Sequence, residues 1–79
     1  MKLITFRSYP ENFEKEISGK KANTVRFMED WGVRKMRDFN ESNIIKIVNT
    51  DTGEYFIRTI TDKTVYKNLA IISWSSNGN

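Results

Sequence analysis

The residues of this sequence that are best suited to chemistry lie within one short segment. Three cations and a hydroxyl follow a glycine there: Gly19, Lys20, Lys21, Thr24 and Arg26. A glycine turns the chain and lets the backbone that follows approach a ligand closely. Arginine holds a phosphate or a base edge through two parallel hydrogen bonds, lysine acts as a mobile point charge, and threonine donates or accepts. This combination predicts a cavity that recognises a phosphate, a nucleobase or a carboxylate.

The spacing of these residues indicates a shared site. In a strand, Thr24 and Arg26 point to the same face, because side chains two residues apart do. Lys20 and Lys21 by themselves are also typical of a solvated helix exit, where the helix dipole mildly favours cations. The sequence leaves both interpretations open for the lysine pair and favours a functional one for Lys21, Thr24 and Arg26 together.

A second group of cations makes the middle of the chain its most basic part. Arg34, Lys35 and Arg37 form this group, and the aromatic residues Trp31 and Phe39 flank it. Aromatic rings beside cations are what a single-stranded nucleic acid needs, because bases stack on the rings and phosphates contact the cations. The alternative is that both aromatic residues close the core and the cations are solvated.

Composition excludes several classes of site. The chain has no cysteine and no histidine, which excludes disulfides, thiolate and imidazole metal sites, and Ser-His or Cys-His catalytic pairs. Its acids do not converge: Glu14 and Glu16 belong to a helix, and Asp51 and Glu54 flank a turn, so we expect no metal and no cofactor. The formal net charge of +3 is a mild bias.

The elements that position these residues can be predicted from residue patterns. Short strands are expected at 3–6, 24–27, 43–48, 54–60 and 69–74. A helix is expected at 9–18, because Ser8 and Glu11 form a capping box, and Phe13 and Ile17 lie on one face. Gly19 ends that helix. Residues 28–42 and 61–68 are expected to be connections, the former with at most one helical turn.

This element order predicts an α+β fold with one domain over residues 1–74 and a disordered tail at 75–79. Five strands and one N-terminal helix suit a small, partly closed β-barrel whose helix covers one end. No apolar run approaches the length needed to span a bilayer, so we expect a soluble, cytoplasmic protein with no membrane partner.

The segment Gly19-Lys20-Lys21-Ala22-Asn23-Thr24-Val25-Arg26, in this place in the element order, resembles the signature of the ASCH group of PUA-like β-barrels. That group has a Gly-x-Lys-x-x-Thr-x-Arg pattern just after its first helix, and Gly19, Lys21, Thr24 and Arg26 match it. The resemblance covers residues 3–74. It implies a PUA-like barrel and a minimal member of the group.

One departure from the group matters for function. Its amidohydrolase branch, which cleaves acetylated cytidine, is similar in the lysine and threonine matched by Lys21 and Thr24. That branch takes a catalytic glutamate from a helical insertion before the last strand, and the corresponding segment here, 61–68, contains no glutamate. Glu54 and Asp62 are the only substitutes that the sequence offers.

Three functions follow, in order of preference. The first is a module that binds RNA or another single-stranded nucleic acid, or a nucleotide-like ligand, through a basic cleft. Its binding residues would be Gly19, Lys20, Lys21, Thr24, Arg26, Trp31, Arg34, Lys35 and Arg37. The second is an amidohydrolase acting on a modified nucleoside with Lys21 and Thr24 as catalytic residues, against which the missing glutamate counts. The third is a small phage or mobile-element protein that binds and inhibits a host protein.

Overall fold

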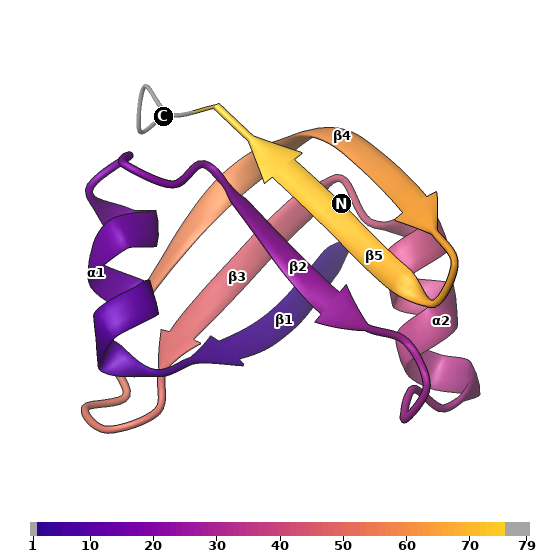
Figure 1. Cartoon of the computed structure of the whole chain (residues 1–79), viewed down its shortest axis with the longest axis horizontal. Helices are drawn as coiled ribbons and strands as arrows, with labels where there is room; N and C mark the ends of the chain where they lie inside the picture. Colours follow the sequence, from indigo (N-terminus) through magenta and orange to yellow (C-terminus); the bar gives the residue numbers. More distant parts are fainter. Residues whose placement is uncertain (1, 76–79) are drawn as a thin grey trace.

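The computed structural model describes residues 2–75, in which two helices flank a single five-stranded sheet (Figure 1). The elements are β1 (Leu3–Ser8), α1 (Pro10–Ile17), β2 (Asn23–Phe27), α2 (Val33–Glu41), β3 (Ile44–Asn49), β4 (Tyr55–Tyr66) and β5 (Leu69–Trp74). Of the tail expected at 75–79, residues 76–79 lie outside the described part of the chain. No helix within the described residues is both long enough and apolar enough to cross a membrane.

The sheet curls because one long strand belongs to both of its halves. The strand order is β1-β3-β4-β5-β2, with β1 parallel to β3 and the other neighbours antiparallel. The first part of β4 pairs with β3, and its second part pairs with β5 after a register shift between Ile60 and Asp62. Such a bulge bends a strand and increases its twist. The result is a half-barrel whose two edge strands are β1 and β2.

The long β4 corrects one sequence expectation. Residues 61–68 were expected to form a polar connection, but β4 continues to Tyr66, and a tight turn then leads into β5 at Leu69. Lys67 adopts a left-handed backbone conformation in that turn (φ 55°). The polar character of this segment misled the prediction because most of its side chains are exposed, so alternation with buried residues is weak.

The second helix corrects another expectation, since residues 28–42 were expected to form a connection and the barrel to have one helix. α2 has nine residues, one more than α1. Phe39 is its only buried residue, and the Lys63 ammonium of β4 donates to the Phe39 carbonyl (2.6 Å). Tertiary contacts thus hold a helix whose own sequence is mostly charged. This helix is also a departure from the ASCH-like arrangement of one helix and five strands.

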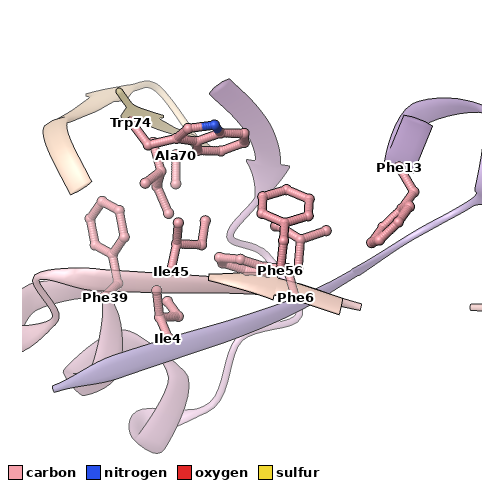
Figure 2. Packing of buried hydrophobic residues seen from close by; sticks show 10 residues of the cluster. Ile4, Phe6, Phe13, Phe39, Ile45, Phe56, Ala70 and Trp74 are labelled. Atoms are coloured by element: carbon pink, nitrogen blue, oxygen red, sulfur yellow. The ribbon is translucent and has the colours of Figure 1, made fainter. Parts of the chain in front are cut away.

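The core fills the concave side of the sheet and connects the two helices (Figure 2). Phe13 of α1 packs against Phe56, which in turn packs against Trp74, with ring centroids 5.5 and 5.9 Å apart. The buried apolar residues are Ile4, Phe6, Phe13, Phe39, Ile45, Ile47, Phe56, Ala70, Ile72 and Trp74. The helices therefore cover opposite ends of one core, and each end can carry its own surface chemistry (Figure 1).

Candidate functional site

A polar pocket of about 220 Å³ lies where α1 meets the two edge strands of the half-barrel. Its lining comes from the end of β1, from α1, from the turn after α1, and from β2. The lining residues are Arg7, Ser8, Tyr9, Asn12, Glu16, Lys21, Thr24, Val25 and Arg26. Lys21, Thr24 and Arg26 of the predicted motif thus line one pocket.

The turn after α1 separates the two adjacent lysines. Gly19 has a left-handed backbone (φ 87°), which glycine adopts without steric cost. The chain then folds back, and the Lys21 amide donates to the Lys15 carbonyl (3.0 Å). Lys21 is half-buried and lines the pocket, whereas Lys20 is exposed and does not. The solvated-exit interpretation therefore fits Lys20, and the site interpretation fits Lys21.

Arg26 joins the two edge strands through its side chain. Its Nε donates to Thr24 Oγ1 (2.8 Å), one Nη donates to the Arg7 carbonyl (2.8 Å), and the other donates to Ser8 Oγ (3.0 Å). The guanidinium also lies 4.9 Å from the centre of the Phe6 ring. Burial lowers the pKa of Arg26 and the negative charge of Glu16 opposes that shift; arginine stays protonated in proteins. Arg26 is thus a fixed cation that braces the wall of the pocket.

Glu16 brings a buried carboxylate to the same pocket. Its side chain is 2% exposed, and its Oε1 atom has no hydrogen-bond partner. A buried polar atom without a partner is costly and rare, so its presence in a pocket wall needs an explanation. Asn12 lies one helical turn before Glu16 and lines the pocket too, as expected for residues four apart on one helix face.

Tyr9 provides an aromatic surface at this pocket. It immediately precedes α1, lines the pocket, and is 74% exposed. An exposed tyrosine ring offers a flat apolar face and a hydroxyl at its tip. The pocket therefore combines cations, a carboxylate, an amide, hydroxyls and one accessible ring.

The other predicted binding residues lie away from this pocket. Trp31 is half-buried against Phe6 and Phe39, with ring centroids 5.7 and 5.6 Å apart. Arg34 and Arg37 are exposed on α2, at the other end of the sheet (Figure 1). Trp31 therefore packs partly into the core, as the alternative interpretation expected, and its stacking role stays a prediction. The pocket lining contains none of the predicted residues from 31 to 37.

Lys35 serves the packing of α2 against β1. Its ammonium donates to the Thr5 carbonyl (2.6 Å) and lies 4.8 Å from the centre of the Phe6 ring. Desolvation by burial lowers the pKa of Lys35; Asp38 opposes that shift, and Arg26 adds to it. Phe6 thus contacts one cation from β2 and another from α2.

The sequence analysis did not select six of the pocket residues: Arg7, Ser8, Tyr9, Asn12, Glu16 and Val25. One signal for Glu16 was present. It lies three residues after Phe13, the residue that anchors α1 to the core, and residues three apart share a helix face. A glutamate on the buried side of an amphipathic helix is unusual enough to mark a site.

Two further findings bear on the chemistry of the site. The described residues contain no cluster of three acidic side chains that could hold a metal ion. No protein-family model matches the chain, and no curated protein is similar to it. The resemblance to the ASCH group therefore depends on the motif and on the order of the strands.

Proposed function

We propose that this protein binds RNA, or another single-stranded nucleic acid, by taking one nucleotide into the pocket between α1 and β2. The observation that carries the proposal is the convergence of Lys21, Thr24 and Arg26 on one polar pocket that also has an exposed Tyr9 ring. Stacking on an aromatic ring and contact of phosphate with a cation are the two components of single-strand binding.

The size of the pocket agrees with a small occupant. Its volume of about 220 Å³ is below the range of roughly 300–1,000 Å³ that drug-sized ligands need. One base therefore suits it better than a long segment of chain. The motif's resemblance to the ASCH group supports the same class of ligand, although fold-level analogy does not determine function by itself.

The test is binding of a fluorescently labelled single-stranded RNA at two salt concentrations. Affinity should fall as salt rises, because phosphates that contact cations release condensed counterions. Lys21→Ala should weaken binding, and Lys20→Ala is the matched control because the neighbouring lysine does not line the pocket. Absence of binding at low salt, or equal effects of the two variants, would contradict the proposal and favour a protein partner.

A second candidate function, hydrolysis of an amide on a modified nucleoside, is favoured by one observation. Segment 61–68 lacks a glutamate, but the pocket contains one, Glu16, which comes from α1. Thr24 would attack the acyl carbon and give its proton to Glu16, while Lys21 would stabilise the developing negative charge. Glu16 would pass the proton to the departing amine, and water would then hydrolyse the acyl-threonine to release acetate. Binding ranks first because a nucleophilic hydroxyl needs a general base to take its proton. Within residues 2–75, no side chain accepts a hydrogen bond from the Thr24 hydroxyl, which itself accepts one from Arg26.

Incubation of the purified protein with acetylated cytidine distinguishes the two functions. We expect no appreciable release of acetate, because the pocket binds the nucleotide without hydrolysing it. Turnover that is lost in Lys21→Ala, in Thr24→Val and in Glu16→Gln, with the fold retained in each, would establish the hydrolase instead.

A further inference from the structure

We infer that Glu16 makes this pocket select bases that carry an exocyclic amino group over bases that carry a carbonyl at the same position. The inference depends on the proposed function, because it states which bases the pocket accepts. Two of the charged residues that line the pocket, Glu16 and Arg26, differ in how far their hydrogen-bonding groups are already paired.

The donors of Arg26 are already engaged by the protein. Its Nε and both Nη atoms donate to Thr24, Arg7 and Ser8. Turning the guanidinium toward the carbonyl oxygen of a ligand would break the side-chain bonds that join β1 to β2. Arg26 is therefore a poor partner for a base carbonyl, even though it carries the right charge.

Glu16 is in the opposite situation. Its Oε1 atom has no hydrogen-bond partner within the described structure, and its side chain is almost fully buried. An ionised carboxylate only accepts hydrogen bonds, so a base that brings an N–H group satisfies this atom. A base that presents a carbonyl oxygen at the same position places a partial negative charge beside this atom and offers it no donor from that position.

The size of the preference follows from this asymmetry. A hydrogen bond to a charged group is about twice as strong as a neutral one. Sites built to bond a particular polar group reject analogues that lack it, because the buried group is then left unpaired. We expect amino-bearing bases to bind about ten-fold or more tightly than their carbonyl counterparts, in line with the discrimination of one good base contact.

Two matched ligand pairs test the inference by fluorescence titration at low salt: labelled oligocytidine against oligouridine, and oligoadenosine against oligoinosine. Each pair exchanges an amino group for a carbonyl on the same ring system. The wild type should prefer the amino-bearing member of both pairs. Glu16→Gln, which offers a donor as well as an acceptor, should reduce the preference to about two-fold or less, because a neutral amide loses the charge-assisted contact.

The control is Glu14→Gln, which removes the same charge from an exposed position on the same helix and should retain the preference. If Glu16→Gln fails to fold, Glu16→Asp keeps the acceptor and should keep the direction of the preference with weaker binding. Equal affinity within both pairs, with binding that still depends on Lys21, would overturn this inference and leave the proposed function intact. No binding of any oligonucleotide would overturn both, and an unchanged preference in Glu16→Gln would remove Glu16 from the account.

Discussion

The two ends of the curled sheet carry the same kinds of residue and differ in what surrounds them. At the α1 end, Lys21 and Arg26 line a pocket that also contains a buried acid. At the α2 end, Lys35 covers the Phe6 ring, while Arg34 and Arg37 are exposed to solvent. Each segment contributes three cations: Lys20, Lys21 and Arg26 in the first, and Arg34, Lys35 and Arg37 in the second. What distinguishes them is convergence on a cavity, which depends on the fold.

The aromatic residues show the same contrast. Tyr9, at the α1 end, is exposed beside the pocket, whereas Trp31, at the α2 end, packs between Phe6 and Phe39. In the sequence, Trp31 is the more attractive stacking residue because cations follow it closely. In the structure, the exposed ring that lines the pocket is Tyr9.

The largest effect that this comparison predicts is on stability. Arg26→Ala removes two hydrogen bonds between β1 and β2 and a third within β2, together with the buried cation that interacts with Glu16. We expect the free energy of unfolding, measured by urea denaturation, to fall by about 2–4 kcal/mol. Arg37→Ala is the control from the α2 end and should change it by less than about 0.5 kcal/mol.

A partial rescue would sharpen that result. Adding Glu16→Gln to the Arg26→Ala variant removes the uncompensated charge, so the double variant should be more stable than Arg26→Ala alone. If Arg26→Ala and Arg37→Ala lowered the free energy of unfolding equally, Arg26 would stabilise the α1 end no more than Arg37 stabilises the α2 end.

The next effect distinguishes the two aromatic residues. Trp31→Ala should lower the free energy of unfolding by about 2–4 kcal/mol, because it removes a large ring from between two core phenylalanines. Val33→Ala, at a position 84% exposed, is the control. If Trp31→Ala instead abolished RNA binding while the protein kept its full stability, the stacking surface would belong to the α2 end.

Tyr9→Ala should show the converse behaviour. Loss of one base–aromatic stack weakens binding by about 1–3 kcal/mol, and removal of an exposed side chain should leave stability within about 0.5 kcal/mol of the wild type. Tyr66→Ala is the matched control, since Tyr66 is 60% exposed and does not line the pocket. Equal RNA affinities of the two tyrosine variants would remove Tyr9 from the binding surface.

The smallest effect concerns pH. Burial lowers the pKa of Lys35 below its ordinary value of 10.5, so between the lowered pKa and 10.5 the unfolded chain binds more protons than the folded one. The free energy of unfolding therefore rises with pH across that window. Lys35→Met should reduce the rise, by less than about 1 kcal/mol because the ammonium is largely solvated. A slope that Lys35→Met leaves unchanged in urea titrations would contradict this.

Elements of the fold that local residue patterns specify could be predicted from the sequence, whereas elements that depend on distant contacts could not. The hairpin around residues 49–53 and the last strand were confirmed, because turn residues and alternation specify them. The helix expected at 9–18 was confirmed as α1, but its predicted capping box was wrong, since Tyr9 is the N-cap and no side chain caps the helix by a hydrogen bond. α2 and the end of β4 were missed, since α2 depends on a distant contact between Lys63 and Phe39. A contact between residues far apart in sequence leaves no local pattern.

Only part of the pocket could be predicted from the sequence, because only some of its residues are placed together by local geometry. Thr24 and Arg26 share a strand face, so their proximity follows from local geometry. Glu16, Tyr9 and Ser8 reach the pocket because β1, α1 and β2 meet there, which depends on the curl of the whole sheet. The carboxylate that lines the pocket, Glu16, belongs to α1, whereas the substitutes that the sequence offered for the missing glutamate were Glu54 and Asp62.

The most direct test of the central claim is a titration of isotope-labelled protein with a short single-stranded RNA, followed by amide chemical shifts in NMR spectra. We expect the amide shifts to change for the pocket-lining residues 7–9, 12, 16, 21 and 24–26, while those of α2 (Val33–Glu41) stay constant. Changes concentrated on α2 would contradict the claim that the α1 end of the sheet is the binding end.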